Sequence, residues 1–342
     1  MVISNANIFH RLISVYIVFL FSLFSYSQQQ LKGIVYDDAT KEPLEAVVVY
    51  LDGTTKGTIT DAFGRFSLEI NTNYNESIVV AYLGYKTVIL NPDKVVDQKN
   101  VLVYLTEEIE SLDPIYLETD DWSREKKLRY FKKYFIGELR IQEKCKIINE
   151  KDIHLYYSSS EKTLYASSSV PLTIKNKYLG YTITYFLREF ELKFSLGSSG
   201  LRLVNSIYFA GTSFFKEYHK KIKNKYIVRR EKSFAGSKLH FMRSLALKKL
   251  QENKFKVFYK GFAGDPYEYF TVELLNNFAK VHLGVERVSI LYDEKHQTDM
   301  WISTDYFLID GFGNYSPIDQ LFFSGYMSNH RVGMMLPLDY NL

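Results

Sequence analysis

The stretch that decides the fold is Thr60-Asp61-Ala62-Phe63-Gly64-Arg65-Phe66, a tight turn that leads directly into a strand. The Asp61 side chain can accept backbone hydrogens two residues further on, and Gly64 can take the positive φ that ends such turns. Phe66, Leu68 and Ile70 then alternate with other residues, as in a half-buried strand. We therefore expect a turn followed by a strand with one buried face.

Further short strands surround this stretch and are separated by Gly, Asn, Asp and Pro signals. We expect strands at residues 31–36, 46–51, 58–60, 65–70, 78–82, 85–90 and 101–105. About seven short strands at regular spacing, with no credible helix among them, predict a small antiparallel β-sandwich.

Five segments of this region, in order, resemble the carboxypeptidase regulatory-like domain, a transthyretin-like Greek-key β-sandwich. They are Gly33–Asp37, Pro43–Val49, Gly53-Thr54 with Gly57-Thr58, Thr60–Phe66 and Tyr82–Tyr85. The resemblance runs from about Lys32 to Leu105 and implies a folding or interaction module, often found at the start of exported Bacteroidetes proteins. Its motif residues are turn glycines and core positions, so the resemblance implies no active site.

The name of this domain does not imply peptidase activity. A zinc carboxypeptidase needs a His-x-x-Glu pair and a later His as metal ligands, with a separate Glu acting on the zinc-bound water. No histidine beyond residue 27 is followed by Glu three residues later, and His-Glu-x-x-His is absent. We therefore predict no zinc peptidase, no metal site and no cofactor.

The first residues have the pattern of a secretory signal. Arg11 precedes the apolar run Leu12–Phe24, and Ser25-Tyr26-Ser27 places small residues where a signal peptidase cleaves. The run of roughly 13 residues is shorter than the ~20 that span a bilayer. We predict a signal peptide at residues 1–27, no transmembrane helix after cleavage, and export to the periplasm or the outer membrane. The lone Cys145 predicts a buried small hydrophobe, and export without disulfides suits a bacterial envelope.

Charge divides the remaining chain into two parts. Residues 28–117 carry seven basic and 14 acidic side chains, whereas residues 118–342 carry 35 basic and 25 acidic ones. We therefore predict a regulatory-like sandwich at 28–106, a linker at 107–120 with one strand at 115–117, and an α+β domain at 121–342 with about two helices and a mostly antiparallel sheet.

Local patterns place particular elements in the second part. Amphipathic helices are expected at 123–136 and 238–252, capped by Ser123 and Ser237, with lysines including Lys127 on the exposed face of the first. The apolar parity changes between Tyr181 and Leu196, which predicts a β-bulge near Arg188-Glu189. Aromatic residues make up 16% of the chain, and we assign them to the core by default; a binding groove or the girdles of a small barrel are the alternatives.

Candidate sites in the second part have competing interpretations. Ser237 and His240 could form a nucleophile and base, but Ser237 is also a helix cap. The side chains of Asp293, Glu294, Asp299, Asp305, Asp310 and His296 could hold a metal or act on a glycan, or could be solvated loop residues. The basic run His219–Lys232 could bind an anionic lipid, lipopolysaccharide or polysaccharide through Lys220, Lys221, Lys223, Lys225, Arg229 and Arg230, or form a solvated hairpin face.

These patterns together predict an exported, non-catalytic protein of the bacterial envelope that acts by binding or assembly. The expected partner is an envelope protein or glycan, with possible peripheral membrane association; an exported chain is not expected to meet nucleic acid. The alternative is a serine-type acyl hydrolase or a glycan-acting hydrolase with its site in residues 121–342.

Overall fold

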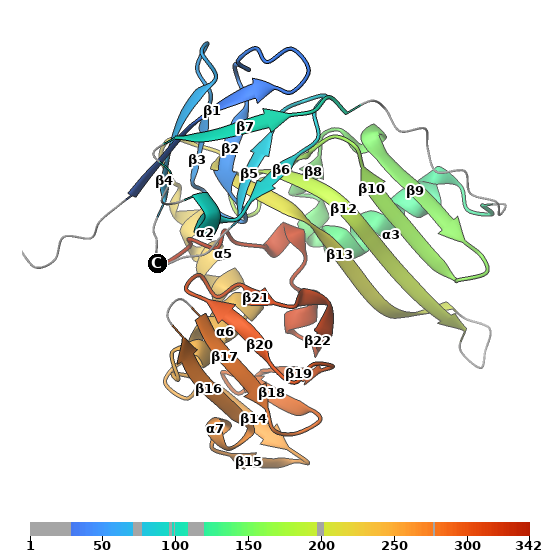
Figure 1. Ribbon diagram of the computed structural model, residues 1–342. Coiled ribbons are helices and arrows are strands. Elements are labelled where there is room, and N and C mark those ends of the chain that lie inside the picture. Colours follow the sequence, from blue (N-terminus) through green and yellow to red (C-terminus); the bar gives the residue numbers. More distant parts are fainter. Residues whose placement is uncertain are drawn as a thin grey trace, which may run out of the picture.

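The computed structural model describes residues 29–70, 77–95, 98, 100–108, 120–196, 202–275 and 278–342. The predicted signal peptide and the predicted strand at 115–117 lie outside these residues. The chain forms three lobes (Figure 1), which we call the N-terminal lobe (29–108), the middle lobe (120–234) and the C-terminal lobe (236–329). Residues 330–342 form a tail. Each lobe has its own cluster of buried apolar residues.

The N-terminal lobe is the seven-stranded sandwich that the sequence predicts. One sheet has the order β4-β1-β7 and the other β3-β2-β5-β6. Its elements are β1 (Gln29–Asp37), β2 (Val48–Leu51), β3 (Gly57–Ile59), β4 (Arg65–Ile70), β5 (Ile78–Ala81), β6 (Val88–Leu90), α2 (Pro92–Val95) and β7 (Val101–Leu105). Alternate residues of β4 face the core, as its apolar period requires.

The turn before β4 has the predicted geometry. The Asp61 Oδ1 accepts hydrogen bonds from the backbone N–H groups of Phe63 and Arg65, each at 2.9 Å. The Gly64 N–H donates to the Asp61 carbonyl at 2.9 Å, and Gly64 has a φ of +69°. Because this φ is strained for residues with a Cβ, glycine is the residue that allows the turn to close.

The middle lobe is a sheet built around one long hairpin. Strand β12 (Tyr181–Leu196) pairs with β13 (Arg202–Glu217) along one edge, and with both β11 and β10 along the other. The remaining elements are α3 (Arg124–Phe135), α4 (Leu139–Gln142), β8 (Cys145–Ile147), β9 (Ile153–Ser158), β10 (Thr163–Ser168), β11 (Leu172–Asn176) and α5 (Asn224–Phe234). The pairing of β12 with β13 shifts between Leu187 and Glu189, which confirms the predicted bulge.

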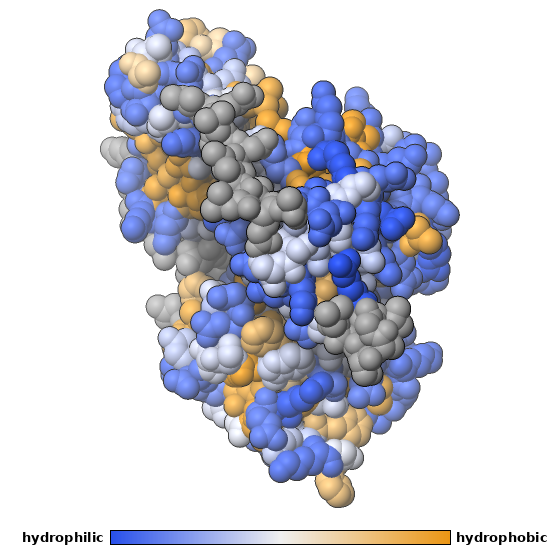
Figure 2. Space-filling model, turned by 90° about the vertical axis from the view of Figure 1, so that its right-hand side faces the viewer, coloured by the Kyte–Doolittle hydropathy of each residue, from blue (hydrophilic) through white to orange (hydrophobic). Residues whose placement is uncertain are grey.

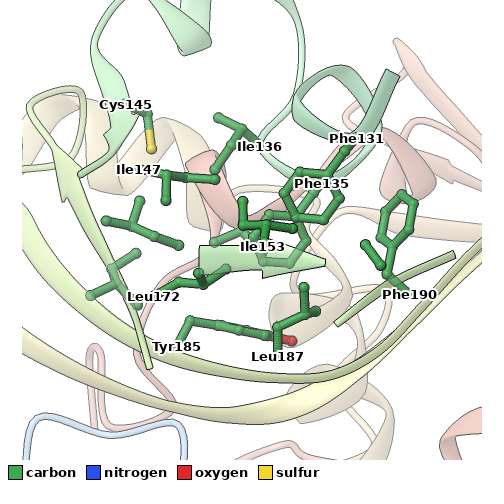
Figure 3. Close-up of a cluster of buried hydrophobic side chains, with 14 of the residues drawn as sticks. Phe131, Phe135, Ile136, Cys145, Ile147, Ile153, Leu172, Tyr185, Leu187 and Phe190 are labelled. Atoms are coloured by element: carbon green, nitrogen blue, oxygen red, sulfur yellow. The ribbon is translucent and has the colours of Figure 1, made fainter. Parts of the chain in front are cut away.

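Helix α3 packs against one face of this sheet. Phe131 and Phe135 are fully buried, with ring centroids 4.9 Å from Phe190 and 5.1 Å from Tyr185, respectively. Figure 3 shows Phe131 and Phe135 with Phe190, Tyr185 and Cys145 among the side chains of this cluster. Burial raises the pKa of the Cys145 thiol to about 12, so the thiol is protonated at neutral pH and packs as a small hydrophobe.

Two expectations for the middle lobe are wrong. Lys127 was expected on the exposed face of α3 but is buried, because its ammonium pairs with Asp120. Residues 224–234 form helix α5, whereas a hairpin face was the main interpretation of this run. The residue before the helix, Lys223, provides no side-chain cap, so the sequence does not mark a helix start; Tyr226, Arg230 and Ser233 form the buried face of α5.

The C-terminal lobe contains two antiparallel sheets and a helix. The sheets have the orders β15-β14-β18-β19-β22 and β16-β17-β20-β21. The helix predicted at 238–252 is found but ends earlier, at Ala246. The elements are α6 (Lys238–Ala246), β14 (Phe255–Tyr259), β15 (Phe262–Gly264), α7 (Pro266–Tyr269), β16 (Phe270–Leu275), β17 (Phe278–Leu283), β18 (Val288–Tyr292), β19 (His296–Ile302), β20 (Phe307–Asp310), β21 (Tyr315–Ser316) and β22 (Leu321–Gly325).

The tail connects all three lobes. The Gly333 N–H donates to the carbonyl of Ile136 in the middle lobe at 3.0 Å, and the Leu338 N–H donates to the carbonyl of Gly53 in the N-terminal lobe at 2.7 Å. The guanidinium of Arg243, on α6, donates to the carbonyls of Leu338 and Tyr340, each at 2.6 Å. The tail thus fixes the positions of the lobes relative to one another.

We predict that Phe135→Ala lowers the free energy of unfolding by about 3–5 kcal/mol, because it leaves a cavity between α3 and the sheet. The exposed Leu139 is the control, and Leu139→Ala should change stability by no more than about 0.5 kcal/mol. Denaturant titration followed by circular dichroism measures both. Equal effects of the two changes would contradict the assigned core.

Candidate functional site

Ser237 and His240, the pair considered for nucleophilic catalysis, lie at the start of α6. The Ser237 hydroxyl accepts a hydrogen bond from the backbone N–H of His240 at 3.1 Å. The His240 Nδ1 accepts one from the N–H of Gly236 at 3.2 Å. A nucleophile needs its base within hydrogen-bond reach, whereas these side chains bond to the backbone of the helix start. The observed arrangement is an N-cap.

His240 belongs to a row of rings that connects α6 with β18, β19 and the turn after β22. We call it the His–Tyr row. Neighbouring ring centroids lie 5.5, 6.5, 3.9 and 4.8 Å apart along the sequence His240, Tyr292, His296, Tyr326 and His330. Residues from α6 to the beginning of the tail therefore meet in one contiguous row, in which the two inner contacts are stacked and the two outer contacts are edge-on.

The two histidines at the ends of the His–Tyr row are held uncharged. Burial lowers the pKa of His240 to about 4, and the charge of Arg243 acts in the same direction. Burial also lowers the pKa of His330 to about 4, with Lys238 and His296 contributing. Both ring nitrogens of His330 are buried without a hydrogen-bond partner among the described residues. Protonation of either ring would place a charge in an apolar environment.

The carboxylates considered for a metal or glycosidase-like site are dispersed. Asp299 accepts from Arg287 and Ser289 at 2.8 and 2.6 Å, and Asp293 pairs with Lys254 at 3.1 Å. The Asp310 Oδ1 closes a turn by accepting two backbone N–H groups. Within the described ranges, no group of three or more His, Cys, Asp or Glu side chains is placed to hold a metal ion.

Four predicted basic residues form an exposed group at the start of α5. These side chains, which we call the α5 basic surface, are Lys220, Lys221, Lys223 and Lys225. No acidic residue lies in the first turn of α5. No carboxylate in the described part of the chain lies within ion-pair distance of these four ammonium groups. Among the residues that the structure describes, the group therefore presents positive charge to solvent without an ion-pair partner.

Arg229 and Arg230 lie apart from the α5 basic surface because both contact the middle lobe. Arg230 is buried, forms a two-point ion pair with Glu217 at 2.8 Å and places its guanidinium 3.8 Å from the Tyr181 ring centroid. Arg229 donates to the Tyr178 carbonyl at 3.1 Å. These two arginines anchor α5 to the end of the β12–β13 hairpin.

The N-terminal lobe meets the middle lobe through the loop between β2 and β3. The Gly53 N–H donates to the Ser213 carbonyl at 2.7 Å, and the Phe215 N–H donates to the Thr54 carbonyl at 3.0 Å. The Asp52 Oδ1 accepts the Ser213 N–H at 2.7 Å. The loop thus bonds to the free edge of β13. Burial raises the pKa of Asp52 to about 6, although the backbone hydrogen bonds and the charge of Arg188 oppose this shift.

The junction residues could not be identified from the sequence. Asp52 and Ser213 are 161 positions apart, and Thr55 and Asp339 are 284 positions apart. Glycine-bracketed loops such as 52–57 are common, so the loop indicates only a turn. His330 was considered only as one of the histidines lacking a Glu partner, since nothing next to it in the sequence shows that it is buried.

We predict that acid destabilises the fold through His240 and His330. The pKa values of these histidines in the folded protein lie below the ordinary value near 6.5. Their contribution to the free energy of unfolding is therefore fully present above pH 6.5 and is lost as pH falls toward 4. Each should reduce the free energy of unfolding by about 1–2 kcal/mol between pH 7 and 5. His330→Phe should reduce this loss, whereas His154→Phe, at an exposed position, should not. Denaturant titrations at the two pH values test this, and identical losses in both variants would contradict it.

We predict that Asp52→Asn stabilises the protein at high pH. A raised carboxyl pKa means that folding favours the neutral form, so stability falls as pH rises from about 4 to 6 and stays lower above. An amide keeps an acceptor for the Ser213 N–H without the charge. The free energy of unfolding should rise by about 1–3 kcal/mol at pH 8 and little at pH 4. The exposed Asp319→Asn serves as control, and a destabilised Asp52→Asn at pH 8 would refute the prediction.

Comparison with solved structures finds nine chains, among them two with TM-scores of 0.19, a value that supports no conclusion. One is a 9R-lipoxygenase from Cyanothece PCC8801, with 13% identity and 64% of this chain covered; the match spans about half, 48%, of the lipoxygenase. The other is a putative membrane-associated protein of unknown function from Bacteroides fragilis NCTC 9343, with 11% identity, 87% of this chain and 94% of that chain. No curated protein sequence matches significantly.

Comparison with protein-family models identifies the first part of the chain. Residues 31–116 match the CarboxypepD_reg-like domain. This range contains β1 through β7, the strands of the N-terminal lobe, and it includes each segment on which the sequence resemblance rests. The match and the observed sandwich agree, so residues 31–116 belong to a carboxypeptidase regulatory-like domain.

Proposed function

We propose that this is an exported, non-catalytic protein of the bacterial envelope that binds an anionic membrane surface through the α5 basic surface. The observation that carries the proposal is the exposure of Lys220, Lys221, Lys223 and Lys225 without ion-pair partners in the described residues. Lysines that are already paired would have to lose their partners before meeting an anionic ligand, whereas these four are available.

Energetics support a diffuse electrostatic interaction. A lysine close to an anionic membrane surface contributes about 1 kcal/mol to binding. Four such side chains alone would bind the membrane weakly. Low ionic strength, avidity or a further contact would strengthen this binding. Seen from the side of the middle lobe, the surface is mainly hydrophilic, with apolar areas between the polar ones (Figure 2).

The carboxypeptidase regulatory-like domain supports a binding role, because such a domain suggests a non-catalytic binding module. The loop between β2 and β3 attaches it to β13, so it would hold the middle lobe in place. Ser237 and His240 are engaged by the backbone at the start of α6. These contacts favour binding over the hydrolase alternative.

Export rests on the predicted signal peptide at residues 1–27. In the described part of the chain, no helix has the length and apolar character needed to cross a bilayer. In this proposal, membrane association is peripheral and depends on the exposed lysines. Fractionation of cells, with N-terminal sequencing of the envelope fraction, is the measurement that checks export and cleavage near Gln28.

We predict that Lys220→Glu/Lys221→Glu weakens binding to vesicles containing phosphatidylglycerol at least about tenfold, because each reversal removes one attraction and adds a repulsion. Co-sedimentation of the purified protein, without its predicted signal, measures the fraction bound. Wild-type binding should decrease as salt increases, because screening shortens the range of the interaction.

The matched control is the exposed lysine pair after α6. Lys248→Glu/Lys249→Glu changes the net charge by the same amount at a distant surface and should reduce binding much less. Vesicles of phosphatidylcholine alone supply the neutral reference. Equal loss in the two double variants would show that only net charge matters, and unchanged binding of the first variant would refute the proposal.

A further inference from the structure

A second group of unpaired cations lies at the other end of the β12–β13 hairpin. It comprises Lys126 and Arg129 on α3 and Arg202 at the start of β13. The α5 basic surface is near the Tyr181–Glu217 end of the same hairpin. With about 3.3 Å per residue, the two ends of these 16-residue strands are on the order of 50 Å apart. The two groups are therefore separate sites.

Two of these cations gather over one indole ring. The Lys126 Nζ lies 4.0 Å from the Trp122 ring centroid, and the Arg202 guanidinium carbon lies 5.3 Å from the same centroid. The Arg202 guanidinium also lies 5.4 Å from the Tyr157 centroid, and the Tyr157 and Trp122 rings stack at 4.1 Å. Cation–π attraction to these rings positions the charged groups.

The rings form a rigid base for this group. Trp122 also contacts Tyr130 and Phe194, with centroids 4.9 and 5.5 Å away, and only 4% of Trp122 is exposed. Its Nε1–H is buried without a hydrogen-bond partner among the described residues.

The charge of the group is not balanced within the described chain. None of the three cations has a carboxylate within ion-pair distance there. The nearby Asp120 pairs with Lys127, and Asp121 accepts from Ser159. Burial lowers the pKa of Lys126, and repulsion from Arg202 and Arg129 lowers it further. The fold therefore places like charges close together. A bound anion would offset the electrostatic repulsion between them.

We propose that Lys126, Arg129 and Arg202 form a binding site for a phosphate group, with Trp122 and Tyr157 as its base. The site offers an ammonium group and two guanidinium groups, and the Lys126 and Arg202 groups lie over the Trp122 ring. Guanidinium groups match the oxygens of a phosphate in two-point contacts, and an ammonium adds a compact charge. Three positive charges suit a phosphate monoester, which carries nearly two negative charges at pH 7. This site is independent of the proposed membrane binding.

Titration with inorganic phosphate tests the site directly. Trp301→Phe leaves Trp122 as the only tryptophan, so its fluorescence reports on the site; sodium chloride keeps the ionic strength constant. We expect a saturable change with an affinity on the order of 1 mM or tighter, which corresponds to about 4 kcal/mol. Calorimetry on the wild-type protein gives a second readout that does not depend on fluorescence. The absence of saturable binding by both methods would overturn the proposal.

Arginine variants identify the residues responsible. Arg202→Gln and Arg129→Gln should each weaken phosphate binding about tenfold or more, since each removes charge-assisted hydrogen bonds. Arg140→Gln, at an exposed position on α4, should leave binding unchanged. Circular dichroism confirms that the variants fold. If all three variants bind phosphate equally, the assignment is wrong.

A further arm distinguishes a free phosphate compound from a lipid headgroup. Vesicles with phosphatidic acid are compared with vesicles of equal charge containing phosphatidylglycerol, both with the Lys220→Glu/Lys221→Glu variant. A preference for phosphatidic acid that Arg202→Gln removes would assign the site to a membrane phosphate. No preference, together with binding of inorganic phosphate, would assign it to a soluble phosphate compound. Loss of vesicle binding in the α5 variants alone would leave the phosphate site unaffected, so the two proposals fail separately.

Discussion

The Arg243 guanidinium holds three separate parts of the chain at one point. It donates to the carbonyls of Phe312, Leu338 and Tyr340 at 2.6–2.8 Å. The three lobes have separate apolar clusters, so burial within each lobe does not by itself fix their relative positions. Hydrogen bonds from a charged donor are about twice as strong as neutral ones. By binding the tail, Arg243 on α6 connects the C-terminal lobe to the loop between β2 and β3 and to the middle lobe.

Through this connection, the regulatory-like domain packs against the rest of the chain and is not joined to it by a linker alone. Gly53 and Thr54 bond to the edge of β13, and an exposed edge is otherwise a template for pairing with another chain. Close approach requires Gly53, because a Cβ there would lie 2.7 Å from the Leu338 side chain. The junction also holds the carboxyl of Asp52, whose raised pKa means that the stability of the fold falls as pH rises from about 4 to 6. Protonation of His240 and His330, the two ends of the His–Tyr row, lowers the stability of the fold as pH falls.

In the middle lobe, the side chains that stabilise the fold are separate from the two groups of cations that we propose as binding sites. One face of its sheet packs on Phe131 and Phe135, and Arg230 anchors α5 through Glu217. The lysines of the α5 basic surface and the cations above Trp122 form no ion pair among the described residues. The two groups lie at opposite ends of the β12–β13 hairpin. The first group suits a diffuse anionic surface, since its charges are exposed to solvent. The second suits a compact anion, since aromatic rings fix its charges.

The sequence by itself determined the local features of this protein: the Asp61–Gly64 turn, the strands of the N-terminal sandwich, the Ser123 and Ser237 caps and the bulge after Leu187. Each depends on residues only a few positions apart, whose backbone preferences act within one turn or strand. The predicted exposure of Lys127 was wrong because its ammonium pairs with Asp120, and the expected hairpin at α5 was wrong because one face of that run packs on the middle lobe. Only the tertiary structure decided the Asp52 junction, the burial of His330 and the gathering of Lys126 with Arg202, because these groups are brought together by chain segments tens to hundreds of residues apart.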